Sequence, residues 1–422
     1  MKKIIIAAVA AVLVVAAYLG QVAYMGTLNQ KLFELSSQPN DFVSIEDVKF
    51  EKGFFTSKAS FLVYLKASEE DLFLFGGLGQ MPISVEVRFK NNVFAKDNVS
   101  VDFANPLFEL LKGSFEGENM TMDKIFLSVK ASISLFGNVK LTSKLNDIDI
   151  QSPEFSIKSK NFTAETRVDL KGNIYGSKFA VDEFALSIQD YIRHDFVFKN
   201  VRAEEILDKG VSYAEYFSQQ PYTSKTTGSV ESVKLYDFSL TDIKSNSQTS
   251  VDKDGLIKAD YTTSIKNINS PSMQVNLDDI NSNFAMSNLS WAVLQNFAVA
   301  SQVDYDDLQS FAAEFFSSSP KIELKNLDFS ANGRKVSSKG EITGSSKEYS
   351  ANFFVESEAV PGEIVPLFQF LGINELFVEK DGKYILDFAF YSDYESEKVS
   401  LNGEVLSDSG ENENAPIIPE IQ

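Results

Sequence analysis

Apolar and polar residues alternate with a period of two along most of the chain. In residues 83–90 every second side chain, from Ile83 to Phe89, is apolar, and residues 125–136 repeat the pattern. Successive side chains of a strand point to opposite faces of a sheet, so this period predicts strands with one buried and one solvated face. Strands of this kind are typical of antiparallel sheets.

Dipeptides that favour tight turns separate several of these strand segments. Asp254-Gly255, Asn332-Gly333 and Asp381-Gly382 each stand between two alternating stretches. A two-residue hairpin loop needs positive φ angles, which Asn, Asp and Gly adopt at low cost. The predicted fold of the body, residues 27–406, is therefore mainly β with a few helices (α+β): an elongated antiparallel sheet of long hairpin strands.

Short helices that pack on the sheet are predicted from helical spacing and end signals. The predicted segments are 105–113, 203–217, 288–300, 305–316 and 365–371. In the first, Asn105 is suited to the N-cap and Pro106 to the first helical position.

The predicted helices 105–113 and 365–371 resemble each other in sequence, and either a duplication into two related halves or chance similarity explains this. A helix of two turns needs tertiary burial to persist, so their apolar side chains are candidate hydrophobic contacts. We expect them in the core, and the alternative is that they line a ligand groove. The residues are Leu107, Phe108, Leu367 and Phe368.

The N-terminal segment has a different character. Two lysines precede residues 4–26, which carry no charge. At about 1.5 Å per residue, a helix of this length crosses a hydrocarbon core of about 30 Å. The positive-inside rule then predicts an uncleaved signal anchor in a bacterial inner membrane, with residues 1–3 cytoplasmic and residues 27–406 periplasmic. A cleaved signal peptide, with Val15 and Ala17 before the cut, is the alternative.

Composition excludes several classes of function. The 59 acidic and 39 basic residues give a formal charge of -20, which disfavours nucleic acid as a partner. With no cysteine and one histidine, the chain cannot form disulfides, iron–sulfur clusters or multi-histidine metal sites. We predict no metal and no cofactor. Residues 407–422, acidic and proline-bearing, are predicted to be a disordered tail.

Spacings that suggest catalysis occur no more often than chance predicts. Ser318 and Ser250 each begin a Ser-x-x-Lys spacing, but no Lys-Thr-Gly follows. His194 precedes Asp195, yet neighbours on a strand point to opposite faces, so His194 is predicted to be a surface residue. The protein is therefore predicted to be non-enzymatic, with no catalytic residue.

Phenylalanine is the most distinctive component, at 36 of 422 residues. One explanation of this high content is that phenylalanine fills the core. The other is that it forms the apolar walls of a groove for acyl chains. The predicted function is binding or handling of a hydrophobic or lipid ligand in the cell envelope. The alternatives are a scaffold that associates with itself or with an envelope protein, and a periplasmic hydrolase.

Residues 50–60 resemble the signature of the YdgA-like family, bacterial inner-membrane-anchored periplasmic proteins with a domain of unknown function. Lys52 stands where that family usually has arginine. The resemblance implies a single-span protein with a β-rich periplasmic body and transfers no catalytic residue. The motif residues are Phe50, Lys52, Gly53, Phe55 and Ser57.

Gly53 suits a tight bend or bulge within this motif. Phe54 and Phe55 are then expected on opposite faces of the strand that follows.

Overall fold

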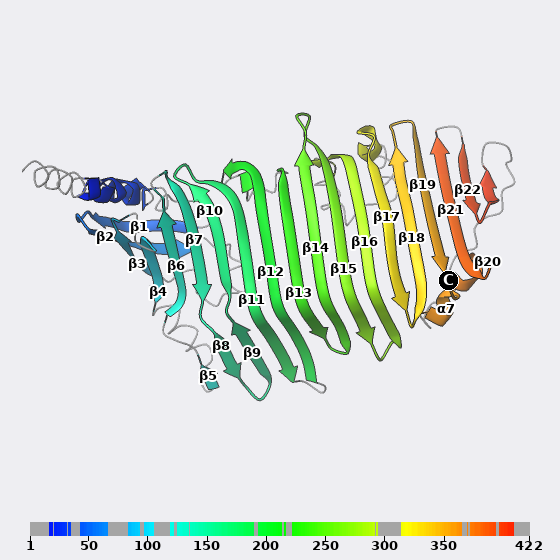
Figure 1. The fold of residues 1–422 in the computed structure, drawn as a ribbon, viewed down its shortest axis with the longest axis horizontal. Coiled ribbons are helices and arrows are strands. Elements are labelled where there is room, and N and C mark those ends of the chain that lie inside the picture. The colour runs from blue at the N-terminus through cyan, green and yellow to red at the C-terminus, as the bar shows by residue number, and fades with distance from the viewer. Residues whose placement is uncertain are drawn as a thin grey trace, which may run out of the picture. The chain divides into compact units, whose positions relative to one another are not determined.

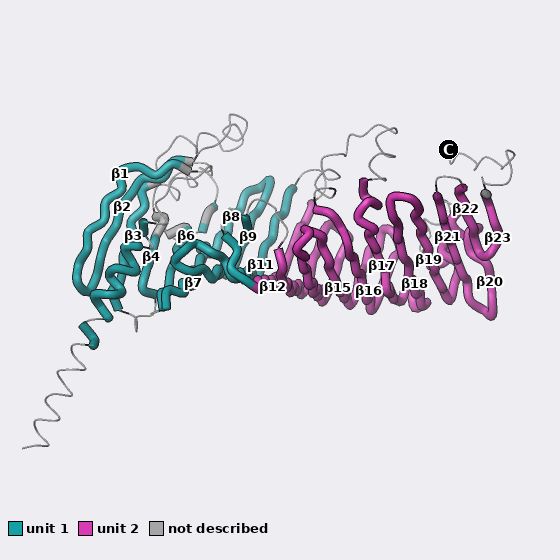
Figure 2. Tube along the Cα trace, turned by 90° about the horizontal axis from the view of Figure 1, so that it is seen from above, with its two compact units in different colours: residues 1–193, 209–217 teal, residues 194–208, 218–422 magenta. Residues whose placement is uncertain are grey.

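The computed structural model of the chain is mainly β, with strands in antiparallel sheet and few helices among the residues it describes (Figure 1). The chain divides into two compact units (Figure 2). Unit 1 is Met1–Arg193 with Lys209–Phe217, and unit 2 is His194–Asp208 with Ser218–Gln422. The described residues are 17–19, 21–31, 33–34, 43–65, 83–92, 97–104, 119–121, 125–134, 136–189, 193–212, 215–216, 222–291, 293, 314–364, 369, 372–393 and 396–408.

In unit 1, antiparallel strands pair in the order β1-β2-β3-β4-β6-β7-β10-β11. The strands β10 and β9 lie end to end along the same side of β11, and β8 pairs with β9 and β5 with β8. Their bounds are β1 (Val43–Glu51), β2 (Thr56–Leu65), β3 (Ile83–Lys90), β4 (Val99–Ala104), β5 (Asn119–Thr121), β6 (Ile125–Ile133), β7 (Asn138–Leu145), β8 (Ile148–Gln151), β9 (Phe155–Lys160), β10 (Thr163–Asp169) and β11 (Asn173–Gln189).

In unit 2, each strand from β13 to β18 pairs with its two neighbours in sequence, and β21 pairs with β19, β20 and β22. The bounds are β12 (Arg193–Ser212), which contributes residues to both units, β13 (Ser224–Leu235), β14 (Phe238–Val251), β15 (Leu256–Ser270), β16 (Val275–Ser290), β17 (Lys321–Ala331), β18 (Arg334–Gly344), β19 (Glu348–Ser357), β20 (Val378–Lys380), β21 (Lys383–Asp393), β22 (Glu397–Leu401), β23 (Glu404–Asp408), α7 (Pro361–Ile364) and η2 (Ile373–Leu376).

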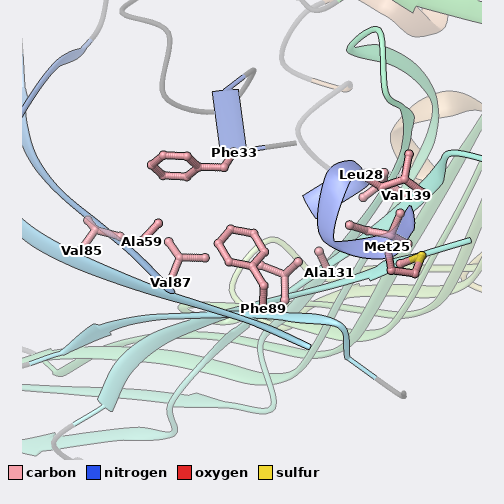
Figure 3. Close-up of a cluster of buried hydrophobic side chains, with 11 residues drawn as sticks. Met25, Leu28, Phe33, Ala59, Val85, Val87, Phe89, Ala131 and Val139 are labelled. Atoms are coloured by element: carbon pink, nitrogen blue, oxygen red, sulfur yellow. The ribbon is translucent and has the colours of Figure 1, made fainter. Parts of the chain in front are cut away.

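The N-terminal helix, described for residues 17–19, 21–31 and 33–34, packs on one face of the sheet in unit 1 (Figure 3). Its buried side chains recur at helical spacing and meet alternating apolar residues of the strands. The Phe33 ring lies 5.3 Å from that of Phe50 and 6.3 Å from that of Phe89. The buried cluster is Met25, Leu28, Phe33, Ala59, Val85, Val87, Phe89, Val99, Ala131, Ile133 and Val139.

This packing involves the C-terminal part of the predicted anchor, residues 4–26. Val22 and Met25 are fully buried within the protein, so the last two turns of that segment contact protein side chains. Within the described residues, no helix combines the length and the apolar character that crossing a membrane requires.

The hairpin predictions are confirmed at two of three positions. Asn332-Gly333 joins β17 to β18, and Asp381-Gly382 joins β20 to β21, all four with positive φ. The third is a wider turn, in which the Asp252 carboxylate accepts the backbone N–H groups of Asp254 and Leu256 at 2.8 and 2.9 Å. A side chain that bonds to nearby backbone groups replaces the two-residue loop there.

The helix predicted over residues 203–217 is wrong for its first ten residues, which belong to β12. Ala203 pairs with Gly228 and Leu207 with Ser224 of β13, and this ladder overrides the local helical spacing.

The other predicted helices have mixed outcomes. Asn288 to Ser290 form the end of β16 instead of a helix, whereas residues 314–316 are helical as predicted. The four hydrophobic contact candidates, Leu107, Phe108, Leu367 and Phe368, lie outside the described residues, and so does the comparison of the two similar helices.

Candidate functional site

The five motif residues lie at one end of the β1–β2 hairpin. Phe50 is in β1 and Ser57 in β2, while Lys52, Gly53 and Phe55 belong to the loop between them. The expected tight bend is present. A Cβ atom on Gly53 would lie 2.0 Å from the carbonyl oxygen of Thr56, so the close approach of the backbone requires glycine.

Phe54 and Phe55 do not point to opposite faces of a strand, because both precede the start of β2. Their rings form a T-shaped pair with centroids 4.9 Å apart. The two side chains are 50% and 59% exposed, so they contribute little to the core.

A fully buried asparagine holds this loop in place. The Asn91 side-chain amide lies 2.8 Å from the carbonyl oxygen of Gly53, 3.0 Å from that of Phe54 and 3.1 Å from Ser57 Oγ. Asn91 Oδ1 accepts a hydrogen bond of 2.7 Å from Asn29 of the N-terminal helix. The side chain therefore joins three elements: the loop, the end of β3 and the helix.

Unit 2 carries a different feature, a face of aligned apolar side chains. Directly opposite residues of antiparallel strands share a face, so the register shows which side chains form a row. One row is Tyr261, Phe284, Leu324, Gly340, Phe353, Phe388 and Leu401, each opposite the next on neighbouring strands from β15 to β22. A second, parallel row is Ala259, Met286, Ile322, Ile342, Ala351, Phe390 and Val399. We call these two rows the apolar face.

The large side chains of the apolar face are only partly buried. Tyr261, Ile342 and Phe353 are 37%, 41% and 40% exposed, and the remaining aromatic side chains of the rows are half-buried. A Cβ on Gly340 would lie 2.7 Å from the Phe353 ring, so the glycine lets this ring lie across β18. The face is thus an open apolar strip.

Short helical segments close the apolar face at both ends of its strands. At one end Phe316, in the helical turn of residues 314–317, stacks on Tyr349 with ring centroids 5.1 Å apart. At the other end Ile364 of α7 is buried in a cluster with Ala331 and Val336. The strip therefore ends at these helical segments in the direction of the strands, and it continues from strand to strand across the sheet.

The opposite face of the same strands is charged. Lys321 Nζ lies 2.6 Å from Glu341 Oε2, and Lys325 Nζ lies 3.0 Å from Asp260 Oδ1. The hydrogen bond to Glu341 raises the pKa of Lys321. The two faces of these strands therefore differ in polarity, and the apolar face is distinct from the charged face.

The hydroxyl of Tyr391, on the charged face, is predicted to lose its proton at a higher pH than an ordinary tyrosine does. Its hydroxyl donates to Glu348 at 3.1 Å and to Asp393 at 3.2 Å. The hydrogen bond to Glu348, followed by desolvation and the bond to Asp393, raises its pKa from 10.0 to about 12. Because folding favours the neutral phenol, the stability it adds is complete below pH 10 and is lost as pH rises through about 12. NMR titration of tyrosine ring carbons, assigned with Tyr391→Phe, checks this; a midpoint near 10 would contradict it.

Two hollows, one in each unit, have no residue of the apolar rows in their walls. In unit 1, a hollow of about 520 Å³ is lined by residues that include Asn98, Ile133 and Arg167. In unit 2, one of about 330 Å³ is lined by residues that include Asp328, Val336 and Lys383. In the part of the chain that the structure describes, no three acidic or histidine side chains group as metal ligands.

The residues singled out for catalysis do not form a catalytic arrangement. Ser318 Oγ donates to the carbonyl oxygen of Asn288 at 2.7 Å, while Lys321 is paired with Glu341. His194 is half-buried instead of lying on the surface, because Tyr236 at the β13–β14 turn places its ring 4.2 Å from the imidazole. Residue spacing alone could not show these contacts.

The comparisons with known proteins give a family without an assigned activity. Residues 1–347 match the family model described as "Bacterial protein of unknown function (DUF945)". No curated protein and no solved structure matched the chain. Since the matched region covers well over half of the 422 residues, the chain belongs to this bacterial family of unknown function.

Proposed function

We propose that the protein binds the acyl chain of a lipid on the apolar face of unit 2, as a non-enzymatic protein of the cell envelope. The observation that carries the proposal is the alignment of two apolar rows with partly exposed Phe353, Ile342 and Tyr261. An exposed contiguous apolar surface on a folded protein is typical of a binding site.

The dimensions of the apolar face suit a chain-like ligand. Neighbouring strands lie about 4.8 Å apart, so a row from β15 to β22 is about 29 Å long. Burial of apolar surface stabilises a complex by roughly 25 cal/mol per Å². The rows contain no charged group, so they would recognise the hydrocarbon part of a ligand and not its head group.

The envelope location and the YdgA-like assignment are part of the same proposal. They are supported by the uncharged segment of residues 4–26 and by the motif around Gly53. The buried positions of Val22 and Met25 limit a membrane anchor to the residues that precede them.

A cross-linking experiment tests the binding of acyl chains. Membranes that contain the full chain are incubated with palmitic acid bearing a mid-chain diazirine, irradiated, and the labelled peptides are identified by mass spectrometry. Label is expected on peptides of β17–β21. Phe353→Asp is expected to lower that labelling at least about tenfold, since it removes an aromatic contact worth roughly 1.5–3 kcal/mol and adds a charge.

Phe354→Asp provides the matched control, because Phe354 is the next residue and lies on the opposite face beneath Lys339 Nζ at 5.5 Å. Its labelling should stay within about twofold of the unchanged protein. Equal labelling of both variants would overturn the proposal. Absence of lipid label from the unchanged protein, together with an oligomer of the chain in native mass spectrometry, would favour the self-associating scaffold.

A further inference from the structure

We propose that the turns at one end of the strands in unit 1 lie against the surface of a phospholipid bilayer. Three phenylalanines in these turns insert into the head-group region, and we call this end of the strands the aromatic edge. This aromatic edge is defined by Phe54, Phe55 and Phe136. The inference uses the membrane anchor of the proposed function but does not depend on acyl-chain binding by unit 2.

The three phenylalanines come from turns at the same edge. The antiparallel register places the β1–β2 loop, the end of β3 and the β6–β7 turn at the same ends of the paired strands. Hydrogen bonds connect these turns: the backbone N–H of Asn91 donates to Phe55, Asn98 Nδ2 donates to Asn92, and the N–H of Ile133 donates to Asn98 Oδ1.

The side chains of the aromatic edge are exposed where turns ordinarily carry polar residues. Phe54 and Phe55 are 50% and 59% exposed, and Phe136 is 92% exposed. Turns favour Gly, Asn, Asp, Pro and Ser, and phenylalanine at such a position adds nothing to the turn itself. By contrast, the β8–β9 turn at the opposite edge exposes Pro153 and Glu154. The described β8–β9 turn thus carries no aromatic side chain.

The N-terminal helix indicates that a lipid bilayer is the partner of the aromatic edge. Gly26 lies against Asn91, and Gln21 donates to Asn92 Oδ1 at 3.3 Å, so the helix reaches the aromatic edge at these residues. Tyr18 and Leu19, nearer the N-terminus, are each 40% exposed, and residues 4–16 before them carry no charge. An uncharged stretch directly before this part of the helix has a composition suited to a lipid phase.

Aromatic side chains are enriched where protein meets the head-group region of a bilayer, because an apolar ring tolerates partial hydration there. Exposed Lys52 and Lys171 stand in two turns of the same edge and can meet lipid phosphates. The rigid loop held by Asn91 would insert Phe54 and Phe55 without further ordering.

Quenching by brominated lipid tests the proposal. The full chain, with Trp291→Phe as background, is reconstituted into phosphatidylcholine vesicles whose acyl chains are brominated near the head group. The probe variants are Phe55→Trp and Phe136→Trp, and Glu154→Trp at the opposite edge is the control. The fluorescence at positions 55 and 136 is expected to fall at least about twofold relative to unbrominated vesicles, with no change at position 154.

Quenching at positions 55 and 136 that is no stronger than at position 154 would overturn the inference. Circular dichroism shows that each variant is folded. If the lipid label on β17–β21 persists while this quenching is absent, the membrane contact of unit 1 fails and the acyl-chain site of unit 2 stands.

Discussion

Replacement of Asn91 by alanine is expected to lower the free energy of unfolding of unit 1 by about 3–5 kcal/mol. The substitution removes the partner of the Gly53 and Phe54 carbonyl groups and of the Asn29 amide. A polar group that is buried and left unpaired costs about 1–3 kcal/mol, and more than one is left here. Hydrogen exchange of the β1–β3 amides measures the loss in the full chain, without interference from the unfolding of unit 2.

Asn92→Ala is the matched control for this variant. Asn92 is adjacent in sequence but only half-buried, and its side chain accepts a longer bond of 3.3 Å from Gln21. Its effect should stay below about 1 kcal/mol. If both substitutions change the exchange of β1–β3 equally, the buried amide of Asn91 does not organise the hairpin loop.

Phe89→Ala is expected to cost about 3–5 kcal/mol, measured by the same exchange experiment. Phe89 is 2% exposed, and its ring lies 5.6 Å from that of Phe50 and 6.3 Å from that of Phe33. Truncation leaves a cavity where the sheet and the N-terminal helix meet. Amides of the helix should therefore lose protection together with those of β3.

Phe136→Ala controls for the loss of a phenyl group. Phe136 is 92% exposed, so its truncation should change the free energy of unfolding by no more than about 0.5 kcal/mol. A small effect at Phe89, comparable with that at Phe136, would contradict the packing of the helix on the sheet.

Local patterns predicted much of this fold because alternation and turn chemistry act between close neighbours in sequence. The strand of residues 83–90 and the hairpin at Asn332-Gly333 are examples. The helix predicted over 203–217 is wrong for residues 203–212 because the pairing of β12 with β13 is a tertiary contact. A helical spacing of apolar residues occurs by chance within a long strand, and only the partner strand decides between the two.

The candidate sites were less accessible to prediction. The excess of phenylalanine suggested an apolar groove, but the alignment of Phe353 with Phe388 depends on the register between strands. The role of Asn91 was missed because its partners at Gly53 and Asn29 are 38 and 62 residues away in sequence. An asparagine after a strand normally indicates only a turn.

The order of strands in unit 2 has a consequence for how this part of the chain forms. From β13 to β18, every strand pairs with the one before it and the one after it in sequence. Apart from β16 and β17, which residues 291–320 separate, the strands from β13 to β19 are joined by short loops, and such local contacts favour rapid folding. Each hairpin can therefore join the growing sheet before the strands that follow it in sequence have folded.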